Sequence, residues 1–372
     1  MRKYSINICF ALSFIISCRQ SYISPAIQNN PSFLVVDGFI NSGQGPTVLT
    51  LSRTANLSTQ LPSPELNATV NVLDENGNAF ALTEKGNGVY SISQVPVDYN
   101  KKYRVQILTA NSKQYLSDLV TPKKTPAIDS IPWELNNNGV NIFVNTHDPG
   151  NNSRYYRWEF AETWERHAFF DSQLKFMDSQ IQLRDPADQI FHCWKTDSAT
   201  NLLVGSSANL QEDIIYRQPI LSIDQGAEQL KILYSIIIYQ YVISKEAFVY
   251  WQNLKKNTEQ LGSLFDAQPM QPIGNLHCVS NPAEPVLGYM SASSVNQKRI
   301  FISNTELAFW YYVPAFDCQE MLISSDQIQR IFSDTLLFVP ITSGISGIYA
   351  AGVECGDCRY SGAVNKKPSF WP

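Results

Sequence analysis

Between residues 33 and 120, short runs rich in β-branched and aromatic residues alternate with clusters of Gly, Asn, Asp and Pro. The runs favour strands and the clusters favour turns. Asn76-Gly77 between two runs is a strong hairpin signal, and Gly86-Asn87-Gly88 marks a further turn. This spacing predicts an immunoglobulin-like β-sandwich of roughly seven strands. The expected strands are 33–36, 47–51, 68–73, a run from 79, 89–92, 103–108 and 114–120.

The longest well-patterned stretch, 231–275, begins with an apolar run and continues as an amphipathic helix. Ile232–Ile243 contains no Gly or Pro and is dense in Ile and Tyr, which predicts a buried strand. Ser244 then supplies a helix N-cap oxygen. Apolar positions recur at steps of four and three over 245–261, so we expect one helix face to pack on its own sheet, with partner docking as the alternative. The stripe comprises Ala247, Trp251, Leu254, Thr258 and Leu261.

Further runs after residue 127 predict a second, larger antiparallel β domain. The expected strands are 139–145, 155–166, 190–196, 201–210, 214–223, 285–292 and 298–303. Thr121–Pro126, with two Pro and two Lys, is the expected linker. The predicted organisation is thus a β-sandwich domain over 31–122 and a β-rich domain over 127–372 with one principal helix and a Cys-containing C-terminal tail. Phe370 and Trp371 are expected to dock on the sheet, or alternatively to contact a partner.

The composition narrows the classes of function. Charged residues make up 16% of the chain, aromatic residues 12%, and the formal net charge is −5. Few charges and many aromatic residues are typical of a β-rich exported protein. Nucleic-acid-binding proteins normally carry a basic stripe, which the sequence lacks, so we expect no nucleic-acid partner.

The first residues have the features of a bacterial lipoprotein signal peptide. Arg2 and Lys3 precede an apolar stretch that ends at a small residue before Cys18, an order that resembles the lipobox. We therefore expect removal of 1–17, lipidation of the Cys18 sulfur, and a polar tether over 18–30. Several acyl chains on one residue hold a protein at a membrane lastingly. An ordinary signal peptide with an incidental Cys is the alternative.

Five of the seven cysteines remain after the signal peptide and the lipidated residue are set aside. They are Cys193, Cys278, Cys318, Cys355 and Cys358. Disulfides are the default in an oxidising compartment, and five thiols allow at most two intramolecular bonds with one thiol left over. The pairing stays open, and a local ring between Cys355 and Cys358 is one possibility.

A zinc site is the alternative use of these residues. His192-Cys193, His277-Cys278 and the Cys355/Cys358 pair offer soft ligands in sufficient number. Adjacent His-Cys pairs are an unusual donor arrangement for a tetrahedral site, so we expect neither a metal nor another cofactor. A thioredoxin-like redox role is weaker still, because the Cys-x-x-Cys pair lacks the strand-to-helix setting of that motif.

Short runs spread over the chain carry a family resemblance. They are Leu34–Gly38, Tyr234–Gln240, Ser244–Ala247, Phe265-Asp266, Gln268-Pro269, Gly274-Asn275, Asn281-Pro282, Val286–Tyr289, Cys355–Arg359 and Lys367–Trp371. Together they resemble an uncharacterised family of Bacteroidota lipoproteins, the domain of unknown function 4249. The resemblance implies an outer-membrane lipoprotein, often encoded beside a TonB-dependent transporter, and implies no activity. Ser361-Gly362 departs from the Gly pair expected there.

The sequence contains no recognisable catalytic signature. It lacks a nucleophile elbow, a metalloprotease His pair, a P-loop and a dinucleotide-binding glycine pattern. His147 adjoins Asp148, but adjacent residues do not form a catalytic relay. Strand aromatics are core more often than sugar-stacking platforms, so we expect the following residues in the core. They are Trp133, Trp158, Trp194 and Trp310.

These observations lead to one functional expectation and two alternatives. We expect a non-enzymatic outer-membrane lipoprotein that captures or presents a nutrient together with a TonB-dependent barrel. It would be anchored through Cys18, on a face of the membrane that the sequence leaves open. The alternatives are an envelope hydrolase acting on glycans or peptides, which a pocket with two carboxylates or a metal would favour, and a structural or adhesive component with a large apolar patch.

Overall fold

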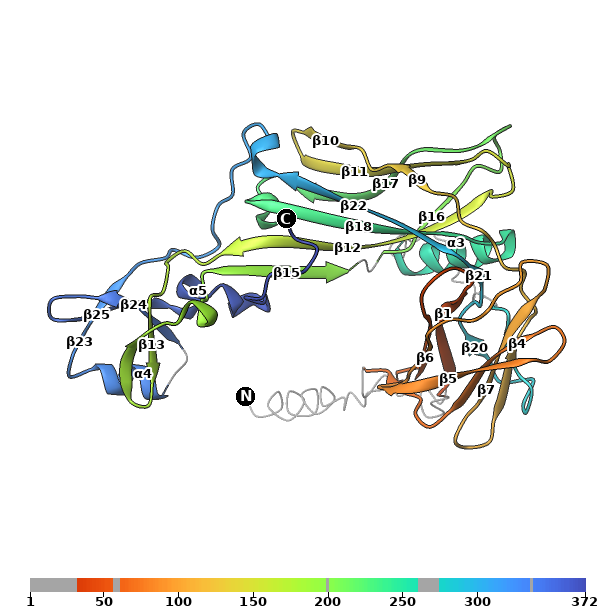
Figure 1. The fold of residues 1–372 in the computed structure, drawn as a ribbon, viewed down its shortest axis with the longest axis horizontal. Helices are drawn as coiled ribbons and strands as arrows, with labels where there is room; N and C mark the ends of the chain where they lie inside the picture. Colours follow the sequence, from red (N-terminus) through yellow and green to blue (C-terminus); the bar gives the residue numbers. More distant parts are fainter. Residues whose placement is uncertain (1–31, 56–60, 199–200, 260–273, 335–336) are drawn as a thin grey trace, which may run out of the picture.

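The computed structural model of the chain describes residues 32–55, 61–198, 201–259, 274–334 and 337–372. The predicted signal peptide over 1–17, the tether over 18–30 and the lipidation site Cys18 lie outside these ranges. The described part is mainly β, as predicted, and comprises an N-terminal sandwich, a central sandwich and a distal lobe (Figure 1). In the described part of the chain, no helix is both long and apolar enough to cross a membrane.

The N-terminal sandwich confirms the strands predicted between 33 and 120. Its first strands are β1 (Leu34–Asn41), β2 (Thr47–Arg53), β3 (Ser63–Pro64), β4 (Thr69–Asp74), β5 (Ala79–Gly86), β6 (Val89–Ile92), β7 (Tyr103–Leu108) and β8 (Gln114–Ser117). β5 pairs with β4 on one side and β6 on the other, so that β8-β7-β4 and β6-β2-β1 enclose one core. Alternate residues point inward: Leu49 and Leu51 of β2 meet Val70 and Val105 there.

Later residues complete the N-terminal sandwich, contrary to the predicted domain division. β19 (Leu276–Cys278) pairs antiparallel with β8, while β20 (Val286–Leu287) and β21 (Ala292–Ser293) pair parallel with β1. Leu276, Val286 and Met290 are buried in the same core. The strand expected at 285–292 therefore belongs to the first unit, because apolar alternation identifies a strand but not its partner.

The central sandwich consists of two antiparallel sheets with one buried core between them. The first sheet contains β9 (Ile128–Ser130), β10 (Trp133–Asn136), β11 (Gly139–Asp148) and β17 (Asp213–Asp224). The second contains β12 (Tyr155–His167), β15 (His192–Ser198), β16 (Leu203–Ser206), β18 (Leu233–Val242) and β22 (Val295–Ser303). Trp158, Trp194 and Trp310 are buried and Trp133 packs against the central core, which confirms the core interpretation of these side chains.

Helix α3 (Lys245–Glu259) lies where the two sandwiches meet, and it confirms the helix predicted over 245–261. The Ser244 hydroxyl accepts a hydrogen bond from the Ala247 N–H at 3.1 Å, as the predicted N-cap requires. Ala247 and Trp251 are buried against the central sandwich, as predicted, while Tyr250 contacts Tyr289 at 5.3 Å between ring centroids. The helix thus joins both units, beyond the predicted packing on its own sheet.

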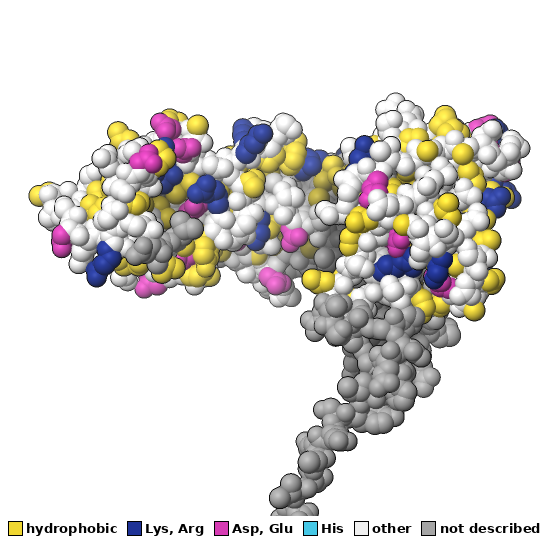
Figure 2. Space-filling view, turned by 90° about the horizontal axis from the view of Figure 1, so that it is seen from below, with side chains coloured by type: hydrophobic (Ala, Val, Ile, Leu, Met, Phe, Trp, Pro, Cys, Tyr) yellow, Lys and Arg dark blue, Asp and Glu magenta, His cyan; other side chains and the backbone are white. Residues whose placement is uncertain are grey.

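The distal lobe lies at the far end of β12 and β15 (Figure 1). It contains β13 (Leu174–Met177), β14 (Gln180–Leu183), β23 (Met321–Ser324), α4 (Ile328–Asp334), β24 (Phe338–Ser343), β25 (Gly347–Gly352) and α5 (Val353–Gly356). Short 3-10 turns are η1 (Pro186–Asp188), η2 (Glu228–Leu230), η3 (Asn304–Glu306) and η4 (Cys358–Ser361). Figure 2 shows hydrophobic, basic and acidic side chains intermixed on the lower face of the molecule.

The C-terminal tail returns from the distal lobe to the central sandwich, as predicted. Trp371 is buried, with its ring 5.6 Å from that of Phe301 and 6.5 Å from that of Trp194. The Arg299 guanidinium lies over the Phe370 ring at 3.7 Å. These aromatic contacts fix the tail on β15 and β22.

Candidate functional site

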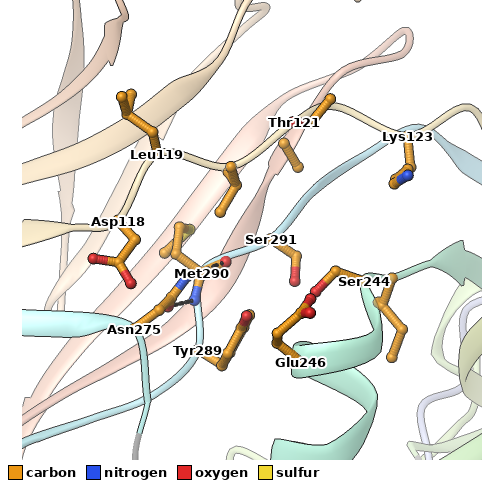
Figure 3. Close-up of a pocket in the computed structure, with 13 residues that line it drawn as sticks. Asp118, Leu119, Thr121, Lys123, Ser244, Glu246, Asn275, Tyr289, Met290 and Ser291 are labelled. Atoms are coloured by element: carbon orange, nitrogen blue, oxygen red, sulfur yellow. Dashed lines mark hydrogen bonds between the residues drawn. The ribbon is translucent and has the colours of Figure 1, made fainter.

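The candidate site is a pocket of about 340 Å³ at the junction of the two sandwiches (Figure 3). Its walls are the segment 118–123, the first turn of α3 and the returning segment 289–292. We call it the junction pocket. Its main polar side chains are Asp118, Thr121, Lys123, Ser244, Glu246 and Ser291. Pockets at domain interfaces with a few convergent polar groups are the usual location of small-molecule sites.

The first turn of α3 supplies one carboxylate to the junction pocket. Glu246 is exposed within the turn that Ser244 caps. Hydrogen bonds from its own backbone N–H and from the Ser244 hydroxyl lower the pKa of Glu246, and the Lys245 charge adds to this effect. The positive end of the helix dipole also favours an anion here. Glu246 is therefore an ionised acceptor at neutral pH.

Asn275 holds the floor of the junction pocket in place. Its side chain donates to the Met290 carbonyl at 2.9 Å and accepts from the Met290 N–H at 2.7 Å (Figure 3). Its own carbonyl accepts from the Asp118 N–H at 2.8 Å. Asn275 is buried, so these bonds are shielded from water and fix the backbone on both sides. Tyr289, next to Met290, points its hydroxyl into the pocket, and burial raises the pKa of that hydroxyl.

The predicted linker forms the remaining wall and is paired with other strands. The Lys123 N–H donates to the Ala292 carbonyl at 2.9 Å, and the Lys123 carbonyl accepts from the Ser294 N–H at 3.0 Å. The Thr125 hydroxyl accepts from the Val242 N–H at 3.1 Å. These bonds hold Lys123 at the pocket rim, where its ammonium group faces a site with two carboxylates.

The charges of the junction pocket suit binding better than acid–base chemistry. A glycosidase-type pair needs one carboxylic acid with a raised pKa beside an ionised carboxylate. The pKa of Glu246 is lowered instead, and Asp118 is exposed with its Oδ1 3.1 Å from His277 Nε2. Two carboxylates, one ammonium group and several hydroxyls form a set of hydrogen-bonding partners for a small polar molecule.

A second hollow of about 560 Å³ is lined by the linker residues 122–126 and by the turn that follows β11. It contains His147, whose Nδ1 lies 2.8 Å from Asp129 Oδ2, a contact that raises the pKa of His147. Asp148 instead accepts hydrogen bonds from the N–H groups of Gly150 and Asn152 at the following turn. His147 and Asp148 therefore have separate hydrogen-bond partners.

A comparison with models of protein families gives a match over most of the chain. The model described as Domain of unknown function (DUF4249) matches residues 21–299. The chain belongs to this family. The match confirms the family resemblance noted in the sequence. The DUF4249 description assigns no activity, and β23–β25 follow the matched region.

Some solved structures are similar to this chain. The crystal structure of a DUF3823 family protein from Bacteroides ovatus ATCC 8483 is similar over 56% of this chain and 90% of that chain. The sequence identity is 10% and the TM-score is 0.14. A comparison with curated proteins gives no match.

The structure settles how the five cysteines of the described chain are used. Cys193 is bonded to Cys358, and Cys318 is bonded to Cys355, with a Cα–Cα distance of 5.7 Å in each pair. Cys278 is a free, buried thiol in the N-terminal sandwich. Two disulfides with one thiol left over match the predicted count, while the local Cys355–Cys358 ring does not form.

The ligand set of the alternative zinc site, His192-Cys193, His277-Cys278 and Cys355/Cys358, is not brought together. The disulfides use the sulfur atoms of Cys193, Cys355 and Cys358, and His277 is paired with Asp118 in the N-terminal sandwich. The sequence pattern did not mark the residues of the junction pocket as a site. Ser244 gave only a helix-cap signal, because nothing local indicates that 118–123 and 289–292 meet at that cap.

Proposed function

We propose that the protein is a non-enzymatic, lipid-anchored binding protein of the outer membrane that captures a small polar nutrient and works with a TonB-dependent transporter. The binding function is proposed from the junction pocket, where two carboxylates, one ammonium group and several hydroxyls converge between the two sandwiches. The proposed anchor rests on the lipobox pattern at Cys18. The proposed partner rests on the family resemblance.

The pocket chemistry favours a ligand with amino or multiple hydroxyl groups. The carboxylates of Asp118 and Glu246 can accept hydrogen bonds from such groups, and Lys123 adds one positive charge at the rim. A volume of about 340 Å³ is at the small end of the range for ligand sites. We therefore propose a ligand of the size of a monosaccharide or a short peptide.

The ligand proposal is tested by calorimetric titration of the mature protein with panels of sugars and short peptides. Glu246→Gln and Asp118→Asn should each weaken binding by roughly tenfold or more, since a hydrogen bond to a charged group contributes about 1.5–3 kcal/mol. Glu212→Gln, at an exposed carboxylate outside the pocket, is the matched control and should bind like the wild type. Equal affinity in all variants would place the ligand elsewhere.

The partner proposal is tested by affinity isolation of the lipidated protein from detergent-solubilised outer membranes, followed by mass spectrometry. A TonB-dependent barrel at near-equal amount supports an accessory role. Cys18→Ser is the control and should leave the protein in the soluble fraction, because the thioether lipid cannot form. Isolation of the bait alone would remove the partner from the proposal while leaving the ligand test unaffected.

An envelope hydrolase is the second candidate, because the junction pocket contains two carboxylates. The lowered pKa of Glu246 opposes it, since an ionised carboxylate cannot act as the general acid. Turnover assays on glycans and peptides decide between the two. Product formation that Glu246→Gln abolishes would replace the binding proposal with the hydrolase.

A further inference from the structure

We propose that Glu165, His167 and His192 form a binding site for a divalent transition metal ion, for which Zn²⁺ is the best-fitting member. We call these three residues the His–Glu cluster. It lies where β12 and β15 leave the central sandwich towards the distal lobe, far along β12 from the junction pocket at 118–123 (Figure 1). The inference is independent of the proposed binding function.

The strand register creates the cluster. β12 and β15 are antiparallel, and His167 lies directly opposite His192 in the ladder. Glu165 is two residues before His167, so both side chains project from the same face of β12. Directly opposite side chains on one face have Cβ atoms about 4.5–5.5 Å apart, and the diagonal neighbour is within reach of a long side chain. The three ligand groups therefore converge without any irregular backbone.

The distances suit coordination of one ion. Glu165 Oε1 lies 2.8 Å from His167 Nε2 and 3.5 Å from His192 Nδ1, and one donor atom from each residue lies within 4.8 Å of the others. Two ligand atoms at about 2.1 Å from a tetrahedral ion are about 3.4 Å apart. The distance from Glu165 Oε1 to His192 Nδ1 already has this value. The distance from Glu165 Oε1 to His167 Nε2 needs to increase by only about half an ångström.

The backbone around His192 is fixed before any ion arrives. The Gln189 side chain accepts from the His192 N–H and donates to the His192 carbonyl, each at 2.8 Å. The next residue, Cys193, is fully buried and bonded to Cys358. A rigid supporting shell of this kind lowers the cost of ordering ligands on metal binding.

The ligand chemistry and the solvent exposure of the His–Glu cluster favour a metal site with one open coordination position. Two imidazoles and one carboxylate are a ligand set that zinc uses where a fourth position stays free for water or another donor. Glu165 is 17% exposed, His167 26% and His192 48%, so an ion can enter from the side of His192. Phe191 contacts both imidazole rings, at 5.0 Å from that of His167 and 4.9 Å from that of His192 between ring centroids.

Two other His–carboxylate pairs of the described chain provide matched controls. His147 is paired with Asp129, and His277 is paired with Asp118. Each pair is exposed, and neither belongs to a group of three potential ligands among the described residues. A metal that merely binds exposed imidazoles would use these pairs as readily as the His–Glu cluster.

The test is equilibrium dialysis of the EDTA-treated mature protein against Zn²⁺ alone at neutral pH, with metal analysis of the protein. We expect one equivalent of Zn²⁺ that His192→Ala and His167→Gln each weaken at least about tenfold, because even outer-shell changes at metal sites cost that much. His147→Gln and His277→Gln should keep wild-type affinity. Circular dichroism of each variant confirms that it is folded.

A second readout uses Co²⁺ in place of Zn²⁺, whose visible absorption reports the ligand set and geometry. Intense tetrahedral bands that are present in wild type and absent in Glu165→Gln support the site, and Glu165→Gln keeps a hydrogen-bonding group at that position so that folding is preserved. Absence of stoichiometric Zn²⁺ binding, or binding that persists in the cluster variants, would overturn the proposal.

Discussion

Single buried polar residues connect parts of the chain that are distant in sequence through hydrogen bonds. Glu284 is the clearest case, because it lies between β19 and β20, in the segment that returns from α3, with only 8% of its side chain exposed. It accepts hydrogen bonds from the Tyr115 hydroxyl at 2.7 Å and from Lys113 Nζ at 2.5 Å, and Arg53 lies 3.8 Å away. These bonds attach the returning segment to β8 and β2.

The first prediction concerns the charge of Glu284. Burial raises the pKa of this carboxyl, but the hydrogen bonds and charges of Lys113 and the hydrogen bond of Tyr115 outweigh it, so the pKa is lowered overall. Glu284→Gln should lower the free energy of unfolding by about 2 kcal/mol at pH 7. Urea denaturation measures the effect.

The pH dependence of that difference follows from the direction of the shift. A lowered carboxyl pKa contributes stability above the unfolded-state value of about 4.3, and this contribution is lost as the pH falls through the folded-state pKa. The gap between wild type and Glu284→Gln should therefore shrink below about pH 4. Glu75→Gln, at an exposed turn, is the control. A gap that stays constant down to acid pH would contradict the assignment.

At the scale of elements, α3 is the helix that the spacing of apolar residues predicted, but its second contact surface was not predictable. Of the predicted stripe, Ala247 and Trp251 are buried and Leu254 is half-buried, whereas Thr258 is exposed and Leu261 lies outside the described residues. Tyr250, which the stripe did not include, is also buried and contacts the N-terminal sandwich through Tyr289. Helical periodicity indicates that one face of the helix is buried. It does not indicate how many structural units pack on that face.

The second prediction separates the two contacts of α3. Trp251→Ala should lower the free energy of unfolding by about 3–5 kcal/mol, since it leaves a cavity in the packing beside Arg157. Tyr250→Phe should cost about 1 kcal/mol, because it removes the hydroxyl that accepts from the Gly288 N–H at 3.2 Å. Val249→Ala, on the exposed side of the helix, should be nearly neutral. Chemical denaturation measures all three, and equal effects would refute the packing described for α3.

At the scale of the whole molecule, the chain leaves the N-terminal sandwich, builds most of the central sandwich and α3, and then returns. β19–β21 cover β8 and β1, which would otherwise be the edges of the first unit. They also bring Leu276, Val286 and Met290 into its core. The two sandwiches are therefore interdependent units of one fold, and the junction pocket exists only where the outgoing and returning segments meet.

The third prediction tests this interdependence. A fragment of residues 32–122 should fail to fold, because it lacks three strands and part of its core. Adding a peptide of residues 274–294 should restore dispersed amide signals in a ¹H–¹⁵N NMR spectrum. A peptide of the same composition in scrambled order is the control. Cooperative folding of 32–122 by itself would show that the returning strands are dispensable.

The sequence pattern did not predict the distal-lobe strands β13, β14 and β23–β25. It determined most strands of the two sandwiches, α3 and its Ser244 cap, the hairpin at Asn76-Gly77, and an upper limit of two disulfides among five thiols. These features depend on side-chain period, capping and residue count, which are local or compositional. Only the tertiary structure decided that 276–293 joins the first unit, which cysteines pair, that Asp118 meets Glu246 at one pocket, and that His167 lies opposite His192. Period-two alternation shows which face of a strand is buried, but it does not show which strand pairs with it. The entropy of closing a loop changes slowly with loop length, so many strand pairings have nearly the same entropic cost until the whole core is packed.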